Sequence, residues 1–137
     1  MGVIMLPVSG AAHAPVADHV VGLGTGKTVN YSLHMVEIVK SATFDRWLRK
    51  LKDRRAAARV LVRIDRLAAG NPGDVKPVGS GISELRIDYG PGYRVYYLQE
   101  GQRLIVLLCG GDKSGQDRDV EQAHKIAEEW RNDDQDD

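Results

Sequence analysis

The sequence predicts a single α+β domain in which a helical hairpin packs on a mostly antiparallel sheet, in the order β–α–α–β–β–β–α. Three observations carry this prediction. Apolar residues recur at helical spacing in segment 42–70, three strand-like runs joined by short turns fill segment 82–109, and another helical stretch follows a polar loop. The length of 137 residues is typical of one domain.

The first strand and the first helix are predicted on either side of Ser41. The run MVEIVK, residues 35–40, alternates apolar and polar positions as a half-buried strand does. The Ser41 hydroxyl suits the N-cap of a helix, ATFDRWLRKLKD. The apolar residues at helical spacing in that helix are Phe44, Trp47, Leu48 and Leu51.

A second helix, RRAAARVLVRIDRLAAG, is predicted after a very short link, so that the two helices form a hairpin. Its expected buried face consists of Val60, Leu61, Ile64 and Leu67. Gly70, followed by Asn71 and Pro72, ends this helix. We expect the next segment, NPGDVKPVGSG, to be a loop.

Three strands follow, near ISELRID, YRVYYLQ and RLIVLLC, and the turns YGPG and EGQ join them as hairpins. Gly110 and Gly111 are then expected to turn the chain sharply away from the sheet. A polar loop, DKSGQ, leads to a last helix over residues 117–131. We expect one sheet face to be covered, which leaves the other face and the loop around Lys113 free to hold a ligand.

Two arginines are predicted on the polar face of the first hairpin. Side chains alternate along a strand, so Arg86 shares a face with Glu84 and Asp88, and Arg94 shares a face with Tyr96. The hairpin therefore brings two like charges onto neighbouring strands, which costs stability unless acids pair with them. Glu84 and Asp88 are the candidates. A charge-paired, solvated sheet face is the alternative interpretation of the same residues.

The charge distribution favours an anionic partner. The chain has 19 Lys and Arg and 19 Asp and Glu, but residues 35–125 hold 17 basic residues against 12 acidic ones. Residues 126–137 hold one Arg against six acids, so 132–137 is predicted to be a solvated acidic tail. A basic domain of this kind is typical of proteins that bind nucleic acid or an acidic partner.

Residues 1–34 have little charge and no periodicity, and we expect a flexible extension that lies outside the domain. They include GLGTGKT, which resembles a phosphate-binding loop, but the first glycine that this motif requires falls on Val21. The single cysteine, Cys109, follows an apolar run and is predicted to be a buried thiol. Four scattered His and one Cys show no ligand spacing, so we expect neither metal nor cofactor. Apolar runs too short to cross a bilayer fit a cytoplasmic protein.

The stretch ELRIDYGPGYRVYY, followed by IVLLCGGDKSGQDRDVEQA, resembles the toxins of bacterial toxin–antitoxin modules. The resemblance is to the phage-related addiction module killer proteins of the RelE/HigB superfamily, and it runs from Met35 to Glu129. It implies a RelE/ParE-like toxin domain over residues 35–131. It also implies an endoribonuclease that cuts mRNA, usually on the ribosome, and that an antitoxin neutralises, typically a helix-turn-helix protein.

The resemblance implies catalytic roles for Arg94, Arg86 and Lys113. Physical chemistry agrees, because an RNA 2′-OH that attacks the adjacent phosphate builds up negative charge that fixed cations stabilise. The family's acid/base residue does not carry over: its best local match is Val120. The predicted RNA-binding residues are Lys76, Tyr89, Tyr96, Gln116 and His124, with the tyrosines as a stacking platform for unpaired bases, although some tyrosines of this segment are expected in the core.

Two other functions remain open from the sequence. A ParE-like toxin uses the same fold to inhibit DNA gyrase by binding it, without a basic triad. A non-enzymatic module would use the basic face only to bind nucleic acid or an acidic protein. Arg86, Arg94 and Lys113 together favour the ribonuclease.

Overall fold

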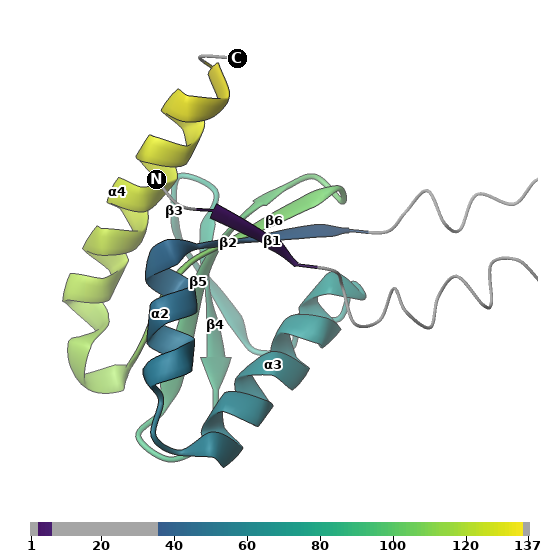
Figure 1. The fold of residues 1–137 in the computed structure, drawn as a ribbon. Helices are drawn as coiled ribbons and strands as arrows, with labels where there is room; N and C mark the ends of the chain where they lie inside the picture. Colours follow the sequence, from purple (N-terminus) through teal and green to yellow (C-terminus); the bar gives the residue numbers. More distant parts are fainter. Residues whose placement is uncertain (1–2, 7–35, 136–137) are drawn as a thin grey trace, which may run out of the picture.

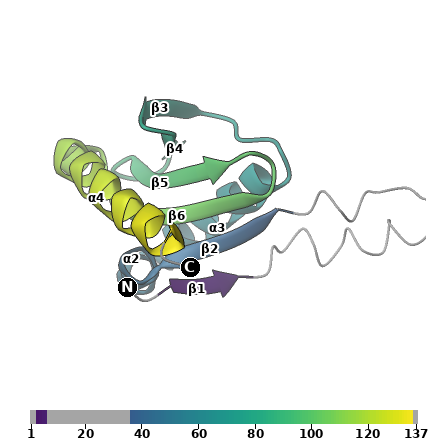
Figure 2. The same ribbon diagram turned by 90° about the horizontal axis from the view of Figure 1, so that it is seen from above.

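The computed structural model describes residues 3–6 and 36–135, which form a mixed sheet between two helical layers. The order of the six strands is β1-β2-β6-β5-β4-β3, with β2 parallel to β6 and every other neighbouring pair antiparallel. Helices α2 and α3 pack on one face and α4 on the other (Figure 1; Figure 2). The elements are β1 (Val3–Leu6), β2 (Glu37–Ser41), α2 (Ala42–Lys50), α3 (Arg54–Ala68), β3 (Val75–Gly79), β4 (Ile82–Ile87), β5 (Tyr93–Glu100), β6 (Leu104–Asp112) and α4 (Gln116–Gln135). The α+β prediction is confirmed.

The helical hairpin forms much as its sequence predicts. The Ser41 hydroxyl accepts a hydrogen bond from the Phe44 amide at 3.0 Å, which caps α2. The Asp53 carboxylate caps α3 in the same way. One predicted core residue is wrong: Leu61 is 46% exposed, because it lies about 100° around the helix from the buried Val60.

Two strands were not predicted. β3 lies in the segment expected to be a loop and pairs with the outer edge of β4. The segment VKPVG shows no alternation of apolar and polar residues, and proline within a sheet is found mainly on edge strands such as this one. β1 lies within the expected N-terminal extension and pairs with β2. The motif GLGTGKT lies outside the described residues.

The role predicted for two glycines in β6 is wrong. Gly110 and Gly111 are part of the strand, which runs on to Asp112, and neither has a positive φ. A Cβ on Gly110 would clash with the Trp47 ring, and one on Gly111 would clash with the Asp119 carboxylate. These glycines therefore allow α2 and α4 to approach the end of β6 closely, rather than turning the chain.

A register shift between β5 and β6 lies next to these two glycines. The pairing jumps from Tyr96↔Cys109 to Tyr97↔Leu107, so Leu108 is the extra residue of a bulge. The Ser41 hydroxyl donates a hydrogen bond to the Leu108 carbonyl at 2.6 Å and so satisfies its backbone. Cys109 is buried as predicted, and burial raises the pKa of its thiol to about 12.

The second face of the sheet is only partly open, which corrects the expectation of a free face. α4 continues to Gln135, beyond the predicted end at Arg131, so the acidic segment begins as helix rather than as a separate tail. Buried residues of α4 pack on the sheet: Ala123, Ile126 and Ala127, against Ile82, Leu98, Val106 and Leu108. The part of this face beyond the N-terminus of α4 holds the site. None of the helices in the described ranges is long and apolar enough to span a membrane.

Candidate functional site

The hairpin of β4 and β5 places the predicted arginines directly opposite each other. The paired positions along it are Ile82↔Leu98, Glu84↔Tyr96 and Arg86↔Arg94. Ile82, Leu98 and Tyr96 belong to the core beneath α4. From one end to the other, this face therefore changes from an apolar core to a buried carboxylate and then to two cations.

Glu84 is the centre of the site. Its side chain is fully buried, and its Oε1 atom accepts a hydrogen bond from Arg86 Nε at 2.9 Å. Its Oε2 atom accepts hydrogen bonds from the Tyr96 hydroxyl at 3.1 Å and from Gln116 Nε2 at 2.7 Å. Arg94 Nε lies 3.5 Å from the same Oε1 atom. One buried carboxylate thus compensates two neighbouring guanidinium groups.

The ionised form of Glu84 is the stable one. Burial alone would raise the pKa of this carboxyl group. The hydrogen bonds from Arg86, Gln116 and Tyr96, together with the positive charge of Arg86, outweigh burial and leave the pKa below its ordinary value of 4.5. Burial and the nearby Glu84 charge raise the pKa of Tyr96, so its hydroxyl stays protonated and donates. Glu84 therefore acts as a fixed anion that orients cations.

Arg94 is held more tightly than Arg86. Its side chain is 12% exposed, against 33% for Arg86. Arg94 Nη1 donates to the carbonyls of Gly92 at 3.1 Å and Tyr93 at 3.2 Å. Arg94 Nε is buried and makes no hydrogen bond, since its approach to Glu84 is an ion pair without hydrogen-bond geometry. The chain thus fixes the Arg94 guanidinium group before any ligand arrives.

Arg86, Arg94 and Lys113 line one pocket of about 380 Å³, here called the cation pocket. Lys113 begins the short 3₁₀ turn Lys113–Gly115 that joins β6 to α4. A Cβ on Gly92 would lie 3.4 Å from Arg94 Nη1 and 3.5 Å from Lys113 Cβ, so the β4–β5 turn fits closely between these two residues. The full lining is Asp74, Arg86, Asp88, Gly90, Pro91, Gly92, Arg94 and Lys113.

Lys113 is exposed and is not paired with its neighbouring carboxylates. The Asp112 carboxylate accepts hydrogen bonds from the amide of Ser114 at 2.8 Å and from its hydroxyl at 2.5 Å. Across residues 36–133, no carboxylate lies within ion-pair distance of the Lys113 ammonium group. Its charge is available to a ligand.

The structure rules out base stacking by Tyr96, one of the predicted RNA contacts. It places two others, Gln116 and His124, in contact with residues of the protein itself. Tyr96 is fully buried, so it cannot stack on a base, because its ring packs beneath α4. Gln116 is half-buried and holds Glu84. His124 Nε2 lies 3.0 Å from the Val78 carbonyl, where it ties α4 to β3 rather than lining the cation pocket.

The remaining predicted RNA contacts also lie beside the pocket rather than in it. Tyr89 packs on the core of the α2–α3 face, and Arg59 covers its ring at 4.5 Å from the centroid. Lys76 is exposed on β3, where its partner in the register is Glu84. Neither residue is part of the pocket lining.

Two acidic residues, Asp74 and Asp88, line the pocket although the sequence did not predict them as site residues. Asp74 was expected within a loop, and Asp88 was expected to pair with an arginine. Both line the pocket, and they are the carboxylates among its described lining residues. Nothing in the sequence pattern brings Asp74 near Arg86, because the pairing of β3 with β4 was not predicted.

Metal ligation finds no support in the described part of the chain, where no group of three or more His, Cys, Asp or Glu side chains comes together. The cation pocket brings together two arginines and a lysine. Arginine forks and an ammonium group bind phosphate or carboxylate oxygens, and partial burial strengthens such interactions.

The fold is that of a small α+β domain, and its cation pocket gathers Arg86, Arg94 and Lys113. Comparison with known protein families is more specific. The chain belongs to the family described as Phage derived protein Gp49-like (DUF891), whose sequence profile matches residues 46–131. This family belongs to the addiction module killer and RelE-like toxin group. A protein of Haemophilus influenzae described as uncharacterized is 54% identical over 94 residues, which cover 69% of this chain and 95% of that protein. The family is compatible with a toxin of a toxin–antitoxin module.

Proposed function

We propose that the protein is the toxin of a toxin–antitoxin module and acts as a metal-independent endoribonuclease on mRNA, with the ribosome presenting the substrate. In this role it inhibits translation in the cytoplasm until a cognate antitoxin, a helix-turn-helix protein, neutralises it. The observation that carries the proposal is the convergence of Arg86, Arg94 and Lys113 on one pocket.

In the proposed reaction the ribose 2′-oxygen attacks the adjacent phosphorus and the bond to the 5′-oxygen breaks. The products are a 2′,3′-cyclic phosphate and a 5′-hydroxyl. Arg94 and Arg86 bind the non-bridging oxygens, on which negative charge accumulates in the transition state. Lys113 approaches from the loop on another side. The 2′-proton passes to Asp74, Asp88 or water, and a proton from solvent neutralises the leaving oxygen.

The buried Glu84 carboxylate explains how two arginines remain close without a bound anion. Glu84 neutralises part of their repulsion, accepts a hydrogen bond from Arg86 and forms an ion pair with Arg94, and these interactions fix the orientation of both guanidinium groups. When a phosphate enters, little side-chain freedom is lost, which is the advantage of a preorganised site. Tyr96 and Gln116 are positioning residues in this scheme, because they act through Glu84.

The test is to incubate the purified full chain with translating ribosomes and to map the ends of the transcripts. We expect cleavage within codons, which Arg94→Ala abolishes and added chelator does not affect. Arg103→Ala, an exposed residue of the β5–β6 turn, is the matched control and should cleave normally. Covalent adducts of DNA gyrase without transcript cleavage would instead identify a ParE-like toxin, and RNA binding without either product would identify a binding module.

A further inference from the structure

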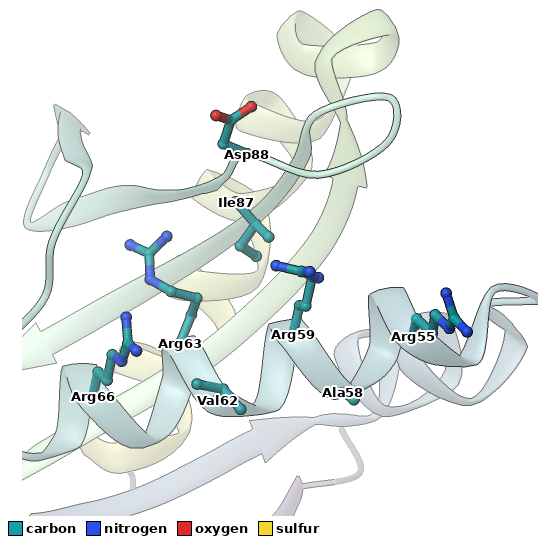
Figure 3. A pocket seen from close by; sticks show the side chains of 8 residues that line it. All are labelled: Arg55, Ala58, Arg59, Val62, Arg63, Arg66, Ile87 and Asp88. Carbon is teal, nitrogen blue, oxygen red and sulfur yellow. The ribbon is translucent and has the colours of Figure 1, made fainter.

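A second basic surface lies on α3, next to the cation pocket. It is a groove of about 550 Å³ lined by Arg55, Ala58, Arg59, Val62, Arg63, Arg66, Ile87 and Asp88. Figure 3 shows the four arginine side chains along α3, with Ile87 and Asp88 of the neighbouring strand end across from them. We call it the α3 groove. The catalytic scheme uses none of its arginines.

The arginines of the α3 groove have different tasks. Arg63 is anchored, since Nη1 donates to the Arg86 carbonyl and Nη2 donates to the Pro72 carbonyl at 2.8 Å. Arg59 lies over the Tyr89 ring. No ion pair to a carboxylate is found for Arg55 or Arg66 within the described residues. Three of the four cations therefore keep their charge free for a ligand.

The floor of the groove is apolar. Ala58 and Val62 follow each other at helical spacing, and Ile87 closes the groove from the sheet. Val62 and the adjacent Leu61 are the large apolar side chains left exposed in the described residues, at 48% and 46%. Exposed aliphatic side chains rimmed by charges are typical of a protein interaction site.

We propose that the α3 groove is the docking site for an acidic, partly apolar segment of a protein partner. Carboxylates of that segment pair with Arg55, Arg59 and Arg66, and its aliphatic side chains cover Val62 and Ala58. Single-stranded RNA fits less well, because nucleic acid offers bases that stack on aromatic rings, and Arg59 already covers the ring of Tyr89.

The position of the groove would allow a docked segment to affect the cation pocket. Asp88 lines both the α3 groove and the cation pocket. Arg63, at the centre of the groove, holds the backbone of Arg86. A partner in the groove therefore lies at the rim of the cation pocket. The consequence for cleavage rests on the proposed function, whereas the docking itself does not.

Docking is tested without any activity measurement. The probe is a fluorescent peptide as long as α3, 15 residues, with Glu and Leu at helical spacing, titrated into the full chain and read by anisotropy. We expect saturable binding that weakens with salt. Arg55→Glu combined with Arg66→Glu should weaken it at least about tenfold, which corresponds to about 1.4 kcal/mol. Val62→Ser should weaken it several-fold.

Arg46→Glu is the control, because this exposed arginine of α2 lies in a different pocket that also contains Gln122 of α4. It should bind the peptide as the wild type does. Melting curves verify that each variant folds, and Arg55→Ala with Arg66→Ala provides a milder second pair. No binding, or an equal loss with Arg46→Glu, would overturn the proposal. So would displacement of the peptide by single-stranded RNA whose affinity depends on Arg55 and Arg66 but not on Val62.

Discussion

The cation pocket and the α3 groove both gather arginines, but they hold them in opposite ways. In the pocket, Arg86 and Arg94 are fixed by the buried carboxylate of Glu84. In the groove, Arg55 and Arg66 extend from an exposed helix face. Burying charges in the pocket costs desolvation free energy but fixes the geometry of the arginines. The exposed arginines of the groove lose little solvation, and their side chains stay free to move.

The difference teaches how two basic clusters in one small domain can be told apart. Stabilising a transition state requires charges whose orientation is set beforehand, and that requires a buried counter-charge. Capturing a partner requires accessible charge and apolar surface, for which mobile side chains suffice. Removing the buried carboxylate of Glu84 should therefore affect both stability and chemistry, while removing Arg55 or Arg66 from the groove should affect neither.

The largest expected effect is that of Glu84→Gln. The amide keeps the size of the side chain but leaves the poorly exposed guanidinium of Arg94 without its counter-charge. Breaking a buried pair in this way costs about 3–5 kcal/mol of unfolding free energy, and we expect the lower end because Arg86 is partly solvated. Urea denaturation measures it. Glu121→Gln on the exposed face of α4 is the control. If Glu84→Gln lost no more unfolding free energy than this control, the Glu84 carboxylate would not be needed to stabilise the two arginines.

Lys113→Ala separates chemistry from stability. The side chain is exposed and unpaired with described carboxylates, so the melting temperature should stay close to that of the wild type. Removing one charge-stabilising group should slow single-turnover cleavage about 100-fold. Lys113→Arg should retain part of the rate, because charge remains while geometry changes. Unchanged cleavage by Lys113→Ala on ribosome-bound message would remove this lysine from the active site.

Acid should weaken the pocket through Glu84. Its pKa is lower in the folded state than its ordinary value of 4.5, so its stabilising contribution is complete above that pH. The contribution disappears as the pH falls through the lower, folded-state pKa. The stability difference between the wild type and Glu84→Gln should therefore be constant near neutral pH and shrink below about pH 4.5. Thermal melts across this range measure the difference, and a gap that widens in acid would contradict the assignment.

The smallest effect is expected in the groove. Arg55→Ala and Arg66→Ala should each change the unfolding free energy by less than about 0.5 kcal/mol, because exposed side chains without buried contacts contribute little. Arg63→Ala is the informative contrast, since Arg63 binds two backbone carbonyls and should cost more. If Arg55→Ala destabilised the fold as much as Arg63→Ala does, the groove would be structural rather than a docking surface.

The sequence predicted those parts that local patterns determine. Periodicity located α2, α3, β4 and β5, and strand alternation placed Arg86 and Arg94 on one face beside Glu84. The pattern did not reveal β3, because an edge strand with a proline shows no alternation. It also misjudged Gly110 and Gly111, because whether a glycine serves a turn or a close packing contact depends on residues distant in the chain.

The sequence predicted the cations of the site, but not the residues that hold them in place. Tyr96, Gln116 and His124 are polar or aromatic side chains in a basic segment, which made RNA contact the natural expectation. Their true neighbours, Glu84 and the Val78 carbonyl, are set by the packing of α4 on the sheet. Asp74 joins the pocket only through the β3–β4 pairing.

The parallel pairing of β2 with β6 cannot form until β6, the last strand in the chain, has been made. Ser41 and Leu108, which join these strands through a hydrogen bond, lie 67 residues apart in the chain. Contacts between such distant residues form slowly, because a long loop must close first. Lys113 and Gln116 follow β6, so they leave the ribosome after every strand has been made. A partly synthesised chain thus carries the arginines of α3 but no assembled cation pocket, and the cell that makes this protein meets its complete site only when translation of the chain is nearly finished.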